Sequence, residues 1–136
     1  VTLAFVACFA TFALFPVQGP WYEWPAPAAV PDGPVRDLVQ RILHAGSSRG
    51  AAFPSSHVAV ATAQSLLALR HQPRVGAVTA LLSLGLAVGA VYGGFHYAID
   101  AVVGAAVGVG AAVGATAWTR RGRAPRVGLH APRRAA

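Results

Sequence analysis

Long apolar segments that carry almost no charge constrain this chain more than any other feature. The sequence is 55% hydrophobic and only 11% charged, whereas soluble domains average about 25% charged residues. Inside a bilayer, backbone polar groups must be satisfied within a helix or a closed barrel. We therefore expect an all-α fold, an integral membrane helical bundle in one domain of residues 1–118. Its four apolar helices are expected at about residues 1–15, 55–69, 75–92 and 99–118.

The first apolar segment, Val1–Phe15, is short for a membrane span. At about 1.5 Å per residue it does not cross roughly 30 Å of hydrocarbon. The chain opens inside this segment with Val1 rather than Met, and no basic stretch precedes it. We expect it to be the outer part of a helix whose N-terminal portion, in a longer protein, is missing here.

Residues 32–46 have a different, amphipathic pattern. Their apolar residues recur at i, i+3, i+4, i+7 and i+8, which places them on one face of a helix; they are Val35, Leu38, Val39, Ile42 and Leu43. The pattern predicts a short helix that lies in the membrane interface. A surface helix packed on protein would show the same pattern.

The positive charges indicate an orientation. The formal net charge is +7, and six of the eleven arginines fall in the last 17 residues. A basic tail after an apolar helix is typical of the cytoplasmic flank of a span, although such a tail can also bind nucleic acid. We favour the membrane interpretation, with no nucleic-acid partner and a disordered cytoplasmic tail at residues 119–136. Arg70 and Arg74 then lie inside as well, which places "FPSSH" and "YGGFHYAID" outside.

One pair of ionisable residues stands in the second of these outer connections. His96 and Asp100 are four residues apart, which puts them on one side of a helix. A carboxylate that accepts a hydrogen bond from one ring nitrogen leaves the other nitrogen as a base or nucleophile. An ionisable residue at the start of an apolar span is costly and often functional. The alternative is a helix cap at Asp100 and an interfacial aromatic ring at His96.

The first outer connection ends in two serines and a histidine. Ser55 and Ser56 are candidate N-caps, and His57 opens the following apolar helix. A helix N-terminus attracts anions such as phosphate, and a histidine there can protonate a leaving oxygen. The alternative is a capping serine and a histidine without a chemical role. Together the two elements form a phosphoryl-transfer set that requires no metal and no cofactor.

The segments "FPSSHVAVA" and "VYGGFHYAIDAVVGAAVG" also resemble a known family. They are similar to the type 2 phosphatidic acid phosphatase superfamily, which includes lipid phosphate phosphatases and vanadium haloperoxidases. The family motifs are P-S-G-H and S-R-x5-H-x3-D. The P-S-S-H form is closest to the inositol phosphorylceramide synthase-like, or inositolphosphotransferase, branch. The resemblance covers roughly residues 11–118 and implies that the four apolar segments match helices three to six of a six-helix core.

The resemblance also implies roles for individual residues. His96 would be the nucleophile that forms a phosphohistidine, and Asp100 the acid that orients it. His57 would protonate the leaving group and then activate water or an acceptor hydroxyl. Ser55 would bind phosphate, and Ser56, which replaces the consensus glycine, would offer its backbone N–H.

The sequence departs from the family at its basic phosphate ligands. The Ser-Arg of the third motif falls on Gly89 and Ala90, and the Lys and Arg of the first motif have no match. Losing charge-assisted contacts should weaken phosphate binding. We expect Arg49 to supply a replacement, with Arg41 and Arg36 as alternatives, although these arginines would serve equally as contacts to lipid headgroups. Trp21 is expected either to line the substrate site or to be an interfacial anchor.

These expectations define a function and its alternative. The chain is expected to be an integral membrane lipid phosphatase or phosphotransferase that acts on phospholipid-type phosphate esters. The enzyme would be a phosphatidic acid phosphatase-like hydrolase or an inositol-phosphate-type phosphotransferase. The alternative is a degenerate or truncated scaffold that binds lipid headgroups. We expect the plasma membrane of a bacterial-type cell, with the active site extracytoplasmic. Partners would be the lipid substrate and the bilayer, and small residues four apart, as at Gly104 and Gly108, permit close helix packing and a homodimer.

Overall fold

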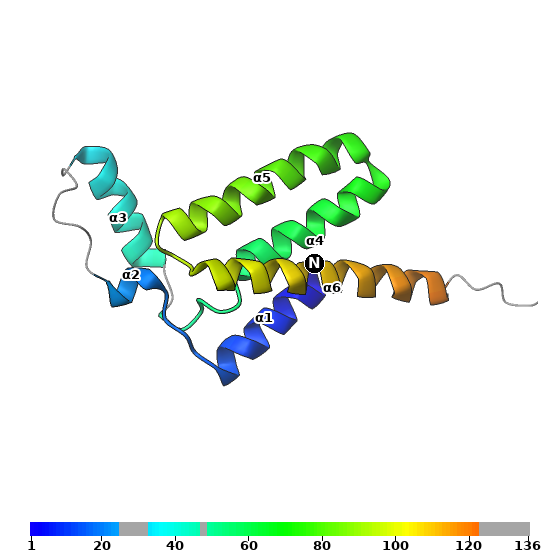
Figure 1. Ribbon diagram of the computed structural model, residues 1–136, viewed down its shortest axis with the longest axis horizontal. Helices are drawn as coiled ribbons and strands as arrows, with labels where there is room; N and C mark the ends of the chain where they lie inside the picture. The colour runs from blue at the N-terminus through cyan, green and yellow to red at the C-terminus, as the bar shows by residue number, and fades with distance from the viewer. Residues whose placement is uncertain (25–32, 47–48, 123–136) are drawn as a thin grey trace, which may run out of the picture.

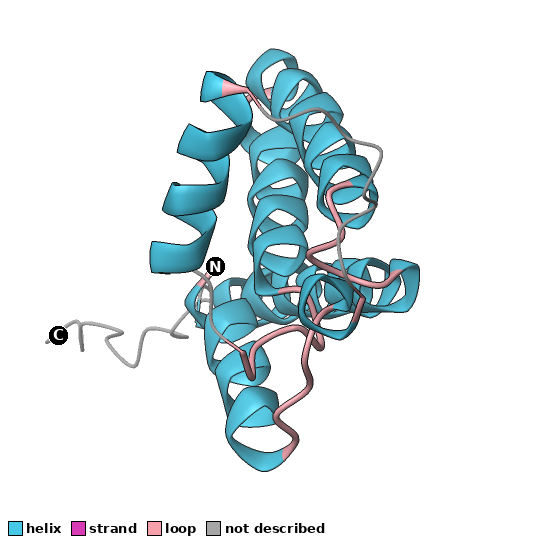
Figure 2. Cartoon of the chain, turned by 90° about the vertical axis from the view of Figure 1, so that its left-hand side faces the viewer, coloured by secondary structure: helices cyan, strands magenta, loops and turns pink. Residues whose placement is uncertain are grey.

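The computed structural model describes residues 1–24, 33–46 and 49–122 of the chain. This part consists of helices joined by loops (Figures 1 and 2). The helices are α1 (Thr2–Leu14), α2 (Pro20–Glu23), α3 (Pro34–Gly46), α4 (Ser56–His71), α5 (Pro73–Tyr92) and α6 (Ala98–Gly122). The all-helical fold class is therefore confirmed for the described residues.

The helices fall close to the segments that the sequence predicts, with two differences. The short helix α2 was not expected, because the prolines around it suggested irregular chain. It begins with Pro20 at its first position after Gly19, where proline's fixed φ suits a helix and its missing N–H costs nothing. Helix α6 continues to Gly122, so residues 119–122 of the predicted tail are helical. The remainder of that tail lies outside the described residues.

Two helices have the length and composition of membrane spans. They are α5, with 20 residues, and Ala98–Arg121 of α6, with 24 residues. At 1.5 Å per residue they extend about 30 and 36 Å. Helix α4 has 16 residues and α1 has 13, which corresponds to about 24 and 20 Å. Of the four predicted spans, only α5 and α6 thus reach the required length in the described residues.

The core lies where α1, α4 and α6 pack together. Its buried members are small residues, namely Ala4, Cys8, Ala59 and Ala63. Helix α5 packs mainly on α4, and leucines of its outer face point away from the bundle; Leu81 and Leu84 are each more than 60% exposed. Outward-facing leucine is the expected pattern for a helix in contact with lipid, because acyl chains are as apolar as leucine itself.

The amphipathic helix α3 stands apart from the bundle (Figure 1). Within the described residues, its backbone does not pack against that of another helix. Val35, Leu38 and Ile42 of its apolar stripe are 74%, 59% and 61% exposed. These three side chains therefore do not pack on protein, which was the alternative to a helix in the membrane interface; the side chains of Val39 and Leu43 lie outside the described residues.

Candidate active site

The N-termini of α4 and α6 meet at one end of the bundle (Figure 1). The backbone N–H of Ser55 donates to the carbonyl oxygen of Asp100 at 3.0 Å. The close approach depends on glycine, because a Cβ at Gly104 would overlap the carbonyl oxygen of Ser55 and one at Gly108 would overlap that of Ala59. The small-residue spacing on α6 therefore serves to bring the two predicted motifs together.

His96 lies in the turn between α5 and α6 and is buried, with 8% of its surface exposed. The turn needs a glycine at Gly94, whose φ is +74°. The Nδ1 atom of His96 lies 2.8 Å from the carbonyl oxygen of Ala52. A carbonyl oxygen only accepts hydrogen bonds, so Nδ1 must carry the hydrogen. In the neutral ring the lone pair is then on Nε2.

Asp100 is buried beside His96, with 2% of its surface exposed. Its Oδ2 atom lies 3.7 Å from His96 Nδ1 and accepts a hydrogen bond of 2.8 Å from the N–H of Tyr97. The carboxylate thus closes the first turn of α6 in the manner of a capping box. We expected the ring hydrogen bond to go to Asp100. In the structure it goes to the backbone of Ala52, and Asp100 lies at ion-pair distance.

Ser55, Ser56 and His57 form the entrance to α4. Ser55 is the N-cap, fully buried, and its Oγ accepts from the N–H of Val58 at 3.5 Å. Ser56 is half-buried and His57 is exposed. The first N–H groups of a helix have no intrahelical acceptor, so this end of α4 presents backbone donors. The structure brings Ser55, His96 and Asp100 together, but within the described residues no hydrogen bond or ion pair joins His57 to them.

A strap formed by residues 16–24 holds the His96 turn in place. The ring of Trp21 stacks on that of Phe95, with centroids 6.1 Å apart. The backbone N–H of Trp21 donates to the carbonyl oxygen of Gly94. The same strap pairs with the loop before α4, because the N–H of Ala52 donates to the carbonyl oxygen of Val17 at 3.1 Å. The strap therefore contacts both segments that meet at the His96–Ala52 hydrogen bond.

Arg49 reaches the strap. Its guanidinium lies 5.5 Å from the centre of the Tyr22 ring, a cation–π distance, and the residue is exposed. Arg49 thus contacts the residue that follows Trp21, and this described contact is with an aromatic ring. Anchoring on an aromatic face leaves guanidinium N–H groups available for an anion.

Two contributors to the site were missed by the sequence reasoning. The Ala52 carbonyl and the Phe95 ring both contact residues that we had singled out. The aromatic residue next to His96 was a usable signal. The Ala52 carbonyl was not, because any residue type supplies one.

An all-helical protein with two apolar helices of spanning length, and with a buried histidine held at the meeting point of two helix N-termini, fits a membrane-embedded phosphoryl-transfer protein. A family model described as PAP2 superfamily matches residues 1–114, and the chain belongs to that superfamily. Members of the PAP2 superfamily are phosphatases or phosphotransferases, and membership together with the two apolar helices indicates a membrane protein. Comparisons with curated proteins and with solved structures give no match.

Proposed function

We propose that this protein is an integral membrane lipid phosphatase or phosphotransferase that acts on phospholipid-type phosphate esters through a phosphohistidine on His96. The observation that carries the proposal is the hydrogen bond between His96 Nδ1 and the Ala52 carbonyl. It fixes the tautomer that leaves Nε2 as the nucleophile. Within the superfamily, we propose that this protein belongs to the inositolphosphotransferase-like branch.

In the first step, the lone pair of His96 Nε2 attacks phosphorus and the bond from phosphorus to the lipid oxygen breaks. His57 donates a proton to that oxygen, so the lipid leaves as an alcohol. The ring gains positive charge as the N–P bond forms. The buried Asp100 carboxylate, 3.7 Å from Nδ1, stabilises that charge.

In the second step, His57 removes a proton from an acceptor hydroxyl, whose oxygen attacks phosphorus as the N–P bond breaks. Water as the acceptor gives inorganic phosphate, and a hydroxyl on a lipid or sugar gives a new phosphate ester. Both outcomes use the same residues. The acceptor that reaches the phosphohistidine decides between them.

Phosphate binding is assigned to the entrance of α4. The N–H groups of Ser56 and His57 lie at the positive end of the helix dipole, where an anion is stabilised. Ser55 shapes this end as the buried N-cap. Arg49, held against Tyr22, is the proposed replacement for the family's missing basic ligands, and Trp21 borders the same side of the site.

The orientation follows from the charge pattern of the sequence. The arginines after α6 and in the α4–α5 turn mark the cytoplasmic side, so the candidate site, at the other end of α4 and α6, is proposed to face the extracytoplasmic side of a plasma membrane.

The test is release of phosphate from a panel of lipid phosphates by the detergent-solubilised protein with EDTA present. His96→Ala is compared with His71→Ala, a matched histidine at the opposite end of α4. We expect release that survives EDTA, disappears in His96→Ala and persists in His71→Ala.

Trapping identifies the covalent step. Brief exposure to a radiolabelled lipid phosphate should leave label on the protein that acid removes and alkali does not, and His96→Ala should carry none. Transfer of label to a lipid acceptor without phosphate release would favour the phosphotransferase. Absence of release, transfer and label would refute the proposal in favour of a scaffold that binds lipid headgroups.

A further inference from the structure

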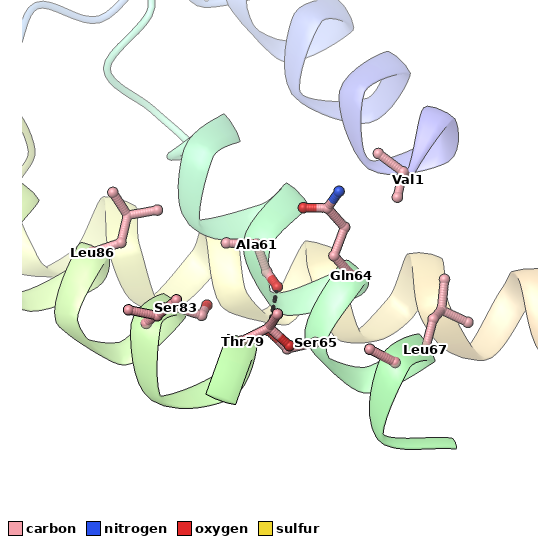
Figure 3. Close-up of a pocket in the computed structure, with 10 residues that line it drawn as sticks. Val1, Ala61, Gln64, Ser65, Leu67, Thr79, Ser83 and Leu86 are labelled. Atoms are coloured by element: carbon pink, nitrogen blue, oxygen red, sulfur yellow. Dashed lines mark hydrogen bonds between the residues drawn. The ribbon is translucent and has the colours of Figure 1, made fainter. Parts of the chain in front are cut away.

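A cavity of about 670 Å³ lies against α4 and α5, below the entrance of α4 (Figure 3). Its lining includes Ala61, Gln64 and Ala68 of α4 and Leu82 and Leu86 of α5, and Val1 borders it. Most of the lining is apolar. The cavity is open to the surface, because Gln64 and Leu82 of its lining are exposed, and its volume falls within the range of small-ligand sites.

The cavity continues the helix face that carries His57. Residues spaced by three or four share a face of a helix, and Ala61, Gln64 and Ala68 follow His57 at i+4, i+7 and i+11. A lipid whose phosphate sits at the α4 entrance would therefore extend its apolar part along this face into the cavity. A second cavity of about 350 Å³ follows a different face of α4 that begins at Val58, and it borders α6 at Ala101, beside Asp100; Gln64 does not line it.

Four polar side chains line the cavity, namely Gln64, Ser65, Thr79 and Ser83, and of these only Gln64 is exposed. The Ser65 hydroxyl donates to the Ala61 carbonyl at 2.7 Å (Figure 3), and the Thr79 hydroxyl donates to the Gly76 carbonyl at 3.1 Å. Both hydroxyl hydrogens are thus used within their own helices. Gln64 is exposed and makes no hydrogen bond within the described residues. Its amide carries two N–H donors.

The depth of Gln64 matches a particular part of a lipid. Seven residues separate it from His57, or about 10 Å along the helix axis. In an acyl lipid phosphate the ester or amide carbonyls lie a few bonds from phosphorus, at the boundary between headgroup and chain. Polyprenyl and alkyl phosphates have no carbonyl there.

We infer that this cavity binds the apolar part of the substrate and that the Gln64 amide donates a hydrogen bond to an acyl carbonyl, so that acyl lipid phosphates are preferred over ether and polyprenyl phosphates. The inference rests on the proposed function and assigns its substrate class. Gln64 is a specificity-determining residue here and takes no part in the chemistry.

The experiment measures kcat/KM for dioleoyl phosphatidic acid, its dialkyl ether analogue and farnesyl phosphate in mixed micelles. Gln64→Leu is compared with Gln72→Leu, a matched glutamine at the C-terminal end of α4. A neutral hydrogen bond contributes about 0.5–1.5 kcal/mol, so we expect Gln64→Leu to lower the ester-to-ether ratio by about three- to tenfold. Gln72→Leu should leave the ratio unchanged. The ratio within one variant is insensitive to partial loss of folded protein.

A second variant tests the cavity itself. Ala61→Phe fills it one turn below His57 and should reduce turnover of the dioleoyl substrate at least fivefold more than that of a dihexanoyl one. The inference is overturned if the wild-type protein treats ester and ether alike, if Gln64→Leu leaves the ratio unchanged, or if Ala61→Phe affects both chain lengths equally. In each of these cases phosphate release persists and the proposed function stands. A wild-type protein that acts on none of the substrates refutes the proposed function and this inference together.

Discussion

Gly104 is the position at which a single added methyl group should damage the site most. A Cβ on Gly104 would overlap the carbonyl oxygen of Ser55 and lie 3.2 Å from the Ser55 Cβ. Both obstacles belong to the backbone or to its first side-chain atom, so neither can rotate away. In Gly104→Ala, α6 must therefore move away from α4 at the point where the two helices carry the candidate site.

The size of the effect follows from the geometry. Carbon atoms pack best at about 3.5–4.0 Å, so clearing the overlap requires a shift on the order of 1 Å. The Ser55–Asp100 hydrogen bond, now 3.0 Å, lies one turn from the collision and would lengthen. A misplacement of this size costs up to about a hundredfold in rate, and overpacking costs about 1–3 kcal/mol of stability. Alanine is more favourable than glycine in a helix by about 1 kcal/mol, and this offsets part of the stability that overpacking costs.

Gly110→Ala on the same helix is the matched control, because a Cβ there meets nothing within 4 Å. We expect Gly104→Ala to lower kcat for phosphate release by about tenfold to a hundredfold and to lower the thermal midpoint in detergent. Gly110→Ala should keep full activity and an equal or higher midpoint. If both variants retain wild-type activity, α4 and α6 do not approach each other at Ser55 as described.

Three further substitutions test the contacts around His96. Asp100→Asn keeps an acceptor for the Tyr97 N–H and removes the negative charge, so kcat should fall about tenfold to a hundredfold without a change in thermal midpoint. A loss of activity as complete as that of His96→Ala would mean that Asp100, and not Ala52, fixes the orientation of the His96 ring. Arg49→Gln, measured beside Arg41→Gln, should raise KM about two- to fivefold with little change in kcat. An unchanged KM would show that Arg49 does not bind the phosphate. Trp21→Leu should destabilise the protein by about 0.5–1.5 kcal/mol through loss of the Phe95 stack, whereas Trp118→Leu, at an exposed position, should not; equal midpoints would show that the strap does not hold the turn.

The helices and the grouping of the site were predictable because they depend on patterns that extend over many residues. Apolar runs bounded by proline and glycine gave the positions of α1, α4, α5 and α6 to within a few residues. Positive-inside reasoning placed the loop before α4 and the turn before α6 on one side, and the hydrogen bond between Ser55 and Asp100 shows that these segments do meet.

Glycine spacing, by contrast, did not reveal which glycines are in contact. Three sets of glycines four apart looked equivalent in the sequence. Among these, Gly104 and Gly108 face the backbone of α4, whereas Gly85, Gly89, Gly110 and Gly114 have open space at the Cβ position. The spacing permits close approach, but the partner helix decides where the approach takes place, and that is a property of the tertiary fold.

The partner of His96 escaped prediction for a different reason, which also explains where the site should be sensitive. The segments that position His96 act largely through backbone atoms: the Ala52 carbonyl on the ring, the Val17 carbonyl on Ala52, and the Gly94 carbonyl on the strap. Backbone groups are the same in every residue, so no motif marks them. Substitutions of the side chains at these positions leave the hydrogen bonds in place as long as the backbone can keep its path. The sensitive positions are therefore those that set the backbone path, and chief among them are the glycines at which two segments touch.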